Sequence, residues 1–199
     1  MKIRSKKYFQ DYEIQETEDQ EGKIKRELVY IGNTYCVSMT EKKYRRKKLL
    51  SAWASVCCMA LFLLANLQDT QSNIEGALPA FGVIAVIPLF VLCCGCVCGL
   101  WKKKIMTRAD YAETSMMVKF GGFFTAVLAG LNFVWHGIFL VKTASSQDMG
   151  KEAAVAAFWL AMLGLSLGLW IAEMRTEYVI RNRYGAVIHQ EHWKRRETE

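Results

Sequence analysis

The stretch FGGFFTAVLAGLNFVWHGIFLV, residues 120–141, decides the fold of this chain. It contains no Asp, Glu, Lys or Arg. The hydrocarbon core of a bilayer is roughly 30 Å thick and a helix rises about 1.5 Å per residue, so a membrane span needs about 20 mainly apolar residues. The stretch therefore predicts a transmembrane helix.

Three further stretches have the same character, namely residues 49–67, 78–101 and 153–171. In lipid the backbone amides must be paired within each segment, so all four stretches should be helices. The alternative is a soluble bundle, but its helices would each carry polar residues along one face, and these blocks do not. We therefore predict an all-α integral membrane protein with a four-helix transmembrane bundle over 49–171. An N-terminal tail, 1–48, and a C-terminal tail, 172–199, flank the bundle.

The overall composition agrees with this class. The chain has 199 residues, of which 52% are hydrophobic and 12% aromatic, which excludes a disordered chain. With 14 Gly and 2 Pro it is not a collagen-like repeat. The first apolar block starts only at residue 49, so we expect it to be an internal start-transfer helix and not a cleaved leader.

The positions of the 26 Lys and Arg predict the orientation of the spans. The first tail holds 13 of them, the 102–119 loop five and the second tail six, whereas the 68–77 loop holds none and the 142–152 loop two. By the positive-inside rule both termini and the middle loop face the cytoplasm, as expected of a multi-pass protein of the cell membrane. The net charge of +7 then reflects topology and anionic lipid, and we expect no nucleic-acid partner.

Small side chains predict where the helices pack. In the third span they share one half of the helical circumference with the polar side chains and include Gly122, Ala126 and Gly130. In the fourth span they form a ladder of Ala153, Ala157, Ala161, Gly164 and Gly168. Such residues let helix backbones approach closely, so both sets predict helix seams. The partner of the ladder can be the third span of the same chain or the fourth span of another copy.

Polar residues within the spans are the main candidates for a site. Asn132 and His136 lie four residues apart near Thr125, so they share a face of the third span. They could bind an ion, a proton or a small solute, or they could simply hydrogen-bond to neighbouring helices. Pro88 frees the carbonyl of Ile84 in the second span and predicts a kink there.

The cysteines admit several interpretations. Cys93, Cys94, Cys96 and Cys98 crowd the end of the second span, and Cys57 and Cys58 lie in the first. A redox pair would sit at a helix N-terminus, and this cluster sits at a C-terminus. Four thiols spread around one helix cannot converge on a metal. Lipidation near the inner interface stays open, but the favoured interpretation is that they serve as small apolar residues.

No other chemistry is indicated by motif. His189, Glu191 and His192 do not have zinc-peptidase spacing, and no phosphate loop or nucleophile motif occurs. We therefore expect no catalytic residues, no metal and no cofactor.

The tails contain short runs typical of strands. Aromatic and β-branched residues bounded by Gly and Asn over 7–39 predict a three-stranded meander, and those over 178–188 predict a hairpin. The two tails could form one small cytoplasmic β-domain of about five strands, with an amphipathic helix on the membrane as the alternative.

The sequence thus favours a non-catalytic accessory, assembly or interaction protein, whose partners are the lipid bilayer and a protein or a second copy of itself. An oligomeric small-solute or ion transporter or channel subunit is the alternative, with Asn132 and His136 lining its path. An embedded thiol oxidoreductase is disfavoured.

Overall fold

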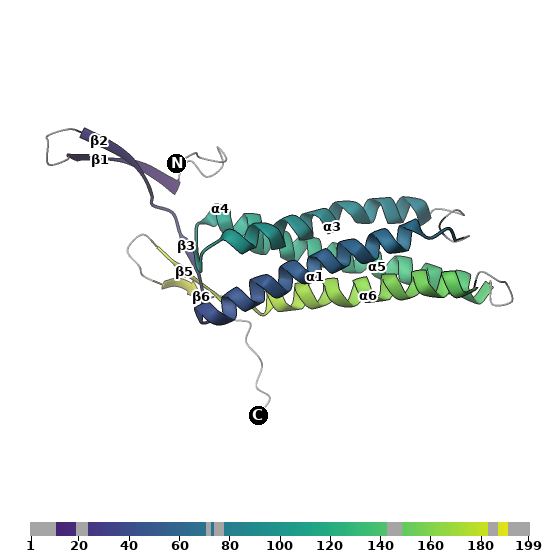
Figure 1. Cartoon of the computed structure of the whole chain (residues 1–199). Coiled ribbons are helices and arrows are strands. Elements are labelled where there is room, and N and C mark those ends of the chain that lie inside the picture. Colours follow the sequence, from purple (N-terminus) through teal and green to yellow (C-terminus); the bar gives the residue numbers. More distant parts are fainter. Residues whose placement is uncertain are drawn as a thin grey trace, which may run out of the picture.

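The computed structural model describes residues 11–18, 24–70, 73, 78–142, 149–182 and 187–190. It confirms the four predicted apolar helices, each long and apolar enough to cross a membrane. They are α1 (Glu41–Leu67), α3 (Leu78–Trp101), α5 (Met117–Lys142) and α6 (Met149–Met174), and they run side by side as one bundle (Figure 1). A short helix α4 (Arg108–Tyr111) and a π-helical turn η2 (Ala112–Met116) lead directly into α5.

Each helix packs against its neighbours in the chain, and α6 closes the bundle by packing against α1. The centre of the bundle is apolar and is built from all four helices. Its largest fully buried side chains include Trp159 of α6 and Leu89 of α3, and Phe62 of α1 meets Trp159 edge to face with the ring centroids 6.0 Å apart. A second buried cluster lies nearer the end of the bundle where α3 ends and α5 begins, and it consists of Leu92, Cys96, Val118 and Leu169.

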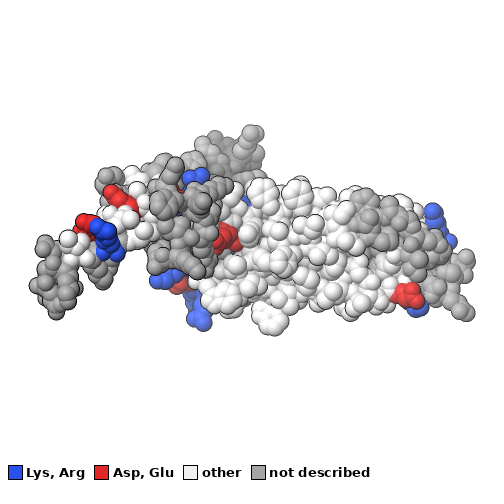
Figure 2. Space-filling view, turned by 90° about the horizontal axis from the view of Figure 1, so that it is seen from above, with Lys and Arg blue, Asp and Glu red and all other residues white. Residues whose placement is uncertain are grey.

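The outward faces of the helices are apolar as well. Val83, Ile87 and Phe90 of α3 are all more than 60% exposed, as is Trp53 of α1. On the face shown in Figure 2, the middle of the bundle carries neither basic nor acidic residues, and these lie toward its two ends. An apolar band between charged ends is the surface expected of a bundle surrounded by lipid, not by water.

Three helices begin earlier than the apolar stretches suggest. Helix α1 starts at Glu41, the α4–η2–α5 helix at Arg108 and α6 at Met149. At the second start, the Thr107 hydroxyl accepts a hydrogen bond from the Asp110 amide at 3.2 Å, and the Asp110 carboxylate accepts one from the Thr107 amide at 3.3 Å. This capping box pairs amides that a helix start leaves free, so the helix begins well before residue 120.

The strands form two separate antiparallel sheets. Strands β1 (Tyr12–Glu18) and β2 (Ile24–Tyr30) form a hairpin. The second sheet has the order β4-β3-β5-β6, with β3 (Thr34–Val37), β4 (Ile105–Met106), β5 (Tyr178–Arg181) and β6 (Val187–Gln190). The third strand of the predicted meander, β3, thus pairs with the middle loop and the C-terminal tail and not with β2. The physical reason is that Val37 and Tyr178 face each other there and bury their side chains.

The four-stranded sheet lies at the end of the bundle where α1 begins and α6 ends (Figure 1). Val37, Met106 and Tyr178, from three different strands, pack on Tyr44 of α1 in one buried cluster. Tyr111 stacks on Tyr35 with ring centroids 4.4 Å apart. The N-terminal tail, the middle loop and the C-terminal tail therefore meet in one unit, which we call the β platform.

Candidate functional site

The three polar residues singled out in the third span are buried in α5. Thr125, Asn132 and His136 are each at most 2% exposed. Asn132 donates a hydrogen bond to the Leu128 carbonyl at 2.8 Å, which is a bond within its own helix. These side chains therefore lie inside one folded chain, and the structure places none of them on an outer face where a second copy could share it.

A carboxylate that the sequence analysis overlooked lies beside His136. Glu152 of α6 is fully buried, and its Oε2 lies 3.7 Å from the His136 Nδ1. The imidazole also stacks on the Trp159 ring, with centroids 6.4 Å apart. Glu152 lies one residue before the predicted fourth span, but α6 already begins at Met149 and therefore includes it. The pair joins α5 to α6 near the end of the bundle remote from the β platform.

The two sets of small residues lie in different surroundings. Gly122 and Ala126 face the bundle interior, and an added Cβ at Gly122 would lie 3.2 Å from the Trp170 Cβ of α6. Gly130 is less tightly packed, with Leu163 3.8 Å from the position of an added Cβ. The α6 ladder points outward, because none of its five members is buried. Ala153 is half-buried, and the exposed members are Ala157, Ala161, Gly164 and Gly168. The ladder therefore forms no helix seam within this chain.

The buried stripe of α6 is a different set of residues, spaced alternately three and four apart. Its members are Glu152, Val155, Trp159, Met162, Ser166, Leu169 and Glu173. A carboxylate thus stands at each end of an otherwise mainly apolar stripe.

The remaining candidate residues are Pro88, the cysteines of α3 and three residues of the C-terminal tail. Pro88 is half-buried within α3, which continues on both sides of it. Cys96 is buried whereas Cys98 is exposed, so these two thiols point to different sides of α3. Among the described residues no group of three His, Cys, Asp or Glu side chains could hold a metal ion. The side chains of His189, Glu191 and His192 lie outside the described part of the chain.

At the platform end, Glu173 joins α6 to α1 and to the sheet. Its Oε2 accepts a hydrogen bond from Lys47 Nζ at 2.5 Å, and its Oε1 accepts one from the Tyr178 hydroxyl at 2.6 Å. Lys47 also donates to the Thr176 hydroxyl. Burial, together with the nearby Glu173 charge, raises the pKa of Tyr178 far above its ordinary value, so this hydroxyl remains a donor. Lys47 is thus part of a buried network as well as of the basic cluster that precedes the first span.

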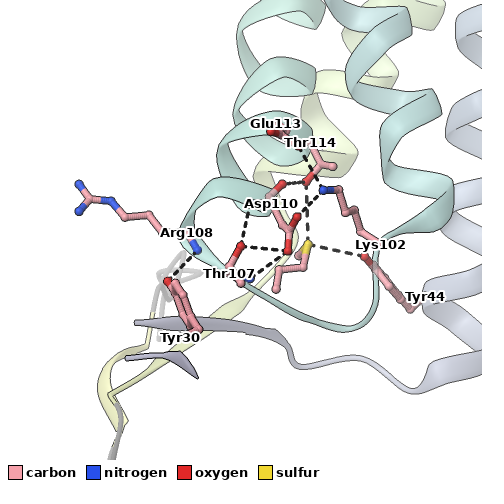
Figure 3. A network of polar contacts seen from close by, with 9 residues as sticks. Tyr30, Tyr44, Lys102, Thr107, Arg108, Asp110, Glu113 and Thr114 are labelled. Carbon is pink, nitrogen blue, oxygen red and sulfur yellow. Dashed lines mark hydrogen bonds and ion pairs between the residues drawn. The ribbon is translucent and has the colours of Figure 1, made fainter. Parts of the chain in front are cut away.

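A second network ties the middle loop to the start of the α4–η2–α5 helix (Figure 3). Lys102 pairs with Asp110 and, at 3.1 Å, with Glu113 Oε2. Burial alone would lower the pKa of Lys102, but the hydrogen bonds to these two carboxylates outweigh it and raise that pKa above its ordinary value. Lys48 of α1 donates to the Leu100 and Lys102 carbonyls at 3.0 and 2.9 Å, where α3 ends. These bonds make the platform a fixed extension of the bundle.

The β1–β2 hairpin projects away from the bundle beside the platform (Figure 1). Its base is held by Tyr30, whose hydroxyl accepts a hydrogen bond from the Arg108 amide at 3.1 Å and donates one to the Asn33 carbonyl at 2.8 Å. Residues that pair across an antiparallel ladder share a face, so the pairs Tyr12–Tyr30, Ile14–Leu28 and Glu16–Arg26 lie on one side of the ribbon.

This hairpin face carries an apolar strip that the described part of the chain does not cover. Ile14 is 60% exposed and Ile24, on the same face nearer the tip, is 67% exposed. The Glu16–Arg26 ion pair at 2.7 Å stands between them. A two-stranded hairpin is at best marginally stable alone in water, and it gains stability when another layer covers its apolar face. The hairpin face of Ile14, Leu28 and Ile24 is therefore the strongest candidate for a binding surface.

Comparisons of the chain with protein-family models, with curated proteins and with solved structures find no match. The structure itself indicates the class. Four long apolar helices make this a membrane-embedded multi-pass protein, with a small β platform fixed to one end of the bundle.

Proposed function

We propose that this protein is a non-catalytic membrane protein that binds a partner protein through its β1–β2 hairpin. The observation that carries the proposal is the uncovered apolar face of the hairpin, with Ile14 and Ile24 exposed. The hairpin is anchored at its base by Tyr30 and projects away from the bundle, so the described part of the chain leaves its apolar face open to a partner (Figure 1). Strand addition to such an edge, with apolar residues covering the face, is a common mode of peptide recognition.

The proposal includes an orientation. The platform unites the two tails and the middle loop, which hold nearly all the Lys and Arg, and the charge rule assigns such a side to the cytoplasm. We accordingly place the hairpin in the cytoplasm, beside the inner surface of the cell membrane, with both termini on the same side. The partner is then a cytoplasmic protein or the cytoplasmic part of another membrane protein.

Removing the apolar side chains of the hairpin face should abolish partner binding. We cross-link the full chain to its partner in its own membrane. For the variant Ile14→Ser with Ile24→Ser we expect at least a tenfold loss of the cross-linked partner, because a few residues that become buried in an interface carry most of its binding energy. The measurement is quantitative mass spectrometry of the cross-linked species from equal amounts of protein.

The matched control is Gln15→Ser with Val29→Ser, which changes the opposite face of the same two strands. It should retain the partner at the level of the unmodified chain. If both variants retain the same partners in the same amounts, the hairpin face is not the binding surface and the proposal fails.

The transporter or channel subunit remains a second candidate because of the buried His136–Glu152 pair, since ionisable groups inside membrane proteins often mark ion or proton paths. It has less support. Both side chains are packed between α5 and α6 of one chain, at 1% and 0% exposure, so they would not line a path between copies.

A further inference from the structure

A groove of about 510 Å³ runs between α1 and α6 on the outside of the bundle. Its floor is open because, in the described part of the chain, no neighbouring residue lies within 4 Å of where a Cβ of Gly164 or Gly168 of α6 would be. On the α1 side it is lined by Leu50, Ser51 and Ala54. This groove is where the outward-facing glycines of the α6 ladder lie, and neither α1 nor α6 fills it.

The groove is apolar along its length and cationic at one end. Lys43, Arg46 and Lys47 line the end next to the β platform. Lys47 is paired with Glu173, whereas Lys43 and Arg46 are exposed and no carboxylate in the described part of the chain pairs with either. The end of the groove therefore presents two positive charges that no described carboxylate pairs with, at the level where the head groups of a bilayer would lie.

The groove runs from the head-group level into one leaflet of a membrane. From Lys43 to Ala54, at 1.5 Å per residue, is about 16 Å along α1. The part of this length inside the predicted first span, Leu50 to Ala54, is about 6 Å, and Gly164 to Ala172 on α6 is about 12 Å, whereas half of the hydrocarbon core is roughly 15 Å. The first part of an acyl chain would thus lie over Gly168 and Gly164 while its phosphate stays beside Lys43 and Arg46.

We propose that this groove binds one anionic glycerophospholipid of the leaflet on the platform side, with the phosphate between Lys43 and Arg46 and an acyl chain over Gly164 and Gly168. Basic pockets between transmembrane helices are known to bind anionic head groups. A second copy of the chain fits less well. A two-fold axis normal to the membrane would place the Lys43 and Arg46 side chains of both copies at the same depth in one interface, where like charges repel.

The proposal is tested with purified full chain in a neutral maltoside detergent, by native mass spectrometry with equal amounts of phosphatidylglycerol and phosphatidylcholine. We expect one phosphatidylglycerol to be retained in preference to phosphatidylcholine. Each juxtamembrane cation contributes roughly a fivefold change in affinity, so Lys43→Gln with Arg46→Gln should lower phosphatidylglycerol binding about 25-fold. Gly164→Leu with Gly168→Leu should remove binding of both lipids.

Two control variants separate the groove from general effects. Lys42→Gln with Arg45→Gln removes the same charge from neighbouring residues that do not line the groove. Gly137→Leu with Gly150→Leu adds the same bulk at two other glycines, which have no described neighbour within 4 Å of an added Cβ. Both controls should retain the phosphatidylglycerol.

Three results would overturn the proposal. Equal retention by the groove-filled variant and the unmodified chain would show that the lipid binds elsewhere. A dimer that only Gly164→Leu with Gly168→Leu dissociates would make a second copy the occupant. Displacement of the lipid by water-soluble glycerol phosphate at equal concentration would show that the site recognises free phosphate.

Discussion

Replacing Glu173 by Ala is expected to lower the free energy of unfolding by about 3–5 kcal/mol, because it removes one partner from a buried charge pair. Lys47, whose side chain is 19% exposed, would lose its carboxylate, and the buried Tyr178 hydroxyl would lose its acceptor. Lys47 would keep only the Thr176 hydroxyl as its acceptor, and a largely buried cation that has lost its carboxylate is costly. Reversible unfolding in mixed micelles, followed by circular dichroism, measures the change.

The double variant Lys47→Met with Glu173→Leu removes both charges of the ion pair, so it distinguishes the loss of the pair from the loss of a single partner. Apolar residues of similar volume can replace a buried ion pair at little cost, so the double variant should be more stable than Glu173→Ala alone. Tyr178→Phe should cost only about 1 kcal/mol, since it removes one hydrogen bond and leaves the charge pair intact. A loss below about 1 kcal/mol for Glu173→Ala would mean that this network does not hold the platform to the bundle.

Replacing Gly121 by Ala is expected to cost about 3 kcal/mol, at the upper end of the range for overpacking a close-packed interior. The added Cβ would lie 2.6 Å from the Leu92 backbone nitrogen and 2.8 Å from its Cα. Backbone atoms cannot turn aside as the end of a side chain can, so α3 and α5 would have to move apart. Thermal unfolding in detergent, with the helical signal as the readout, measures the effect.

The matched control is Gly137→Ala on the same helix, where no neighbouring residue that the structure describes lies within 4 Å of the added Cβ. Because Ala favours helix over Gly, this variant should be unchanged or slightly stabilised. If Gly121→Ala and Gly137→Ala had equal stability, the close approach of α3 and α5 at Gly121 would be disproved.

The apolar helices could be predicted because length and the absence of charge define a span without reference to the rest of the chain. Their ends could not be found in that way. The predicted third span starts at residue 120, yet the helix starts at Arg108. The Thr107-Arg108-Ala109-Asp110 sequence is a capping-box signal that would have revealed this start.

The same criterion excluded Glu152 and Glu173, because a span chosen for its lack of charge must end before a carboxylate. Counting in steps of three and four from Trp159 reaches both residues, so the spacing could have placed them on one face of α6. Their partners His136 and Lys47 come from other helices, and no local pattern identifies such contacts.

The β platform is hardest to predict from sequence. Its central pair joins Thr34 to Arg181 across most of the chain, and β4 is only two residues long. Runs this short have no periodicity to measure, and their pairing depends on where the bundle places the two tails and the middle loop. The hairpin face is different, since Tyr12, Ile14, Leu28 and Tyr30 are visible in the sequence, but whether anything covers it is known only from the fold.

The side of the membrane on which the platform lies is tested most directly by labelling single cysteines from outside the cell. In a chain whose seven cysteines are replaced by serine, Glu13→Cys, Lys103→Cys and Asp69→Cys place one thiol each on the hairpin, the middle loop and the opposite end of the bundle. With a membrane-impermeant maleimide on intact cells we predict that only Asp69→Cys is labelled, and that the other two are labelled after permeabilisation. Labelling of Glu13→Cys or Lys103→Cys in intact cells, or equal labelling of all three, would contradict four spans that carry a cytoplasmic β platform.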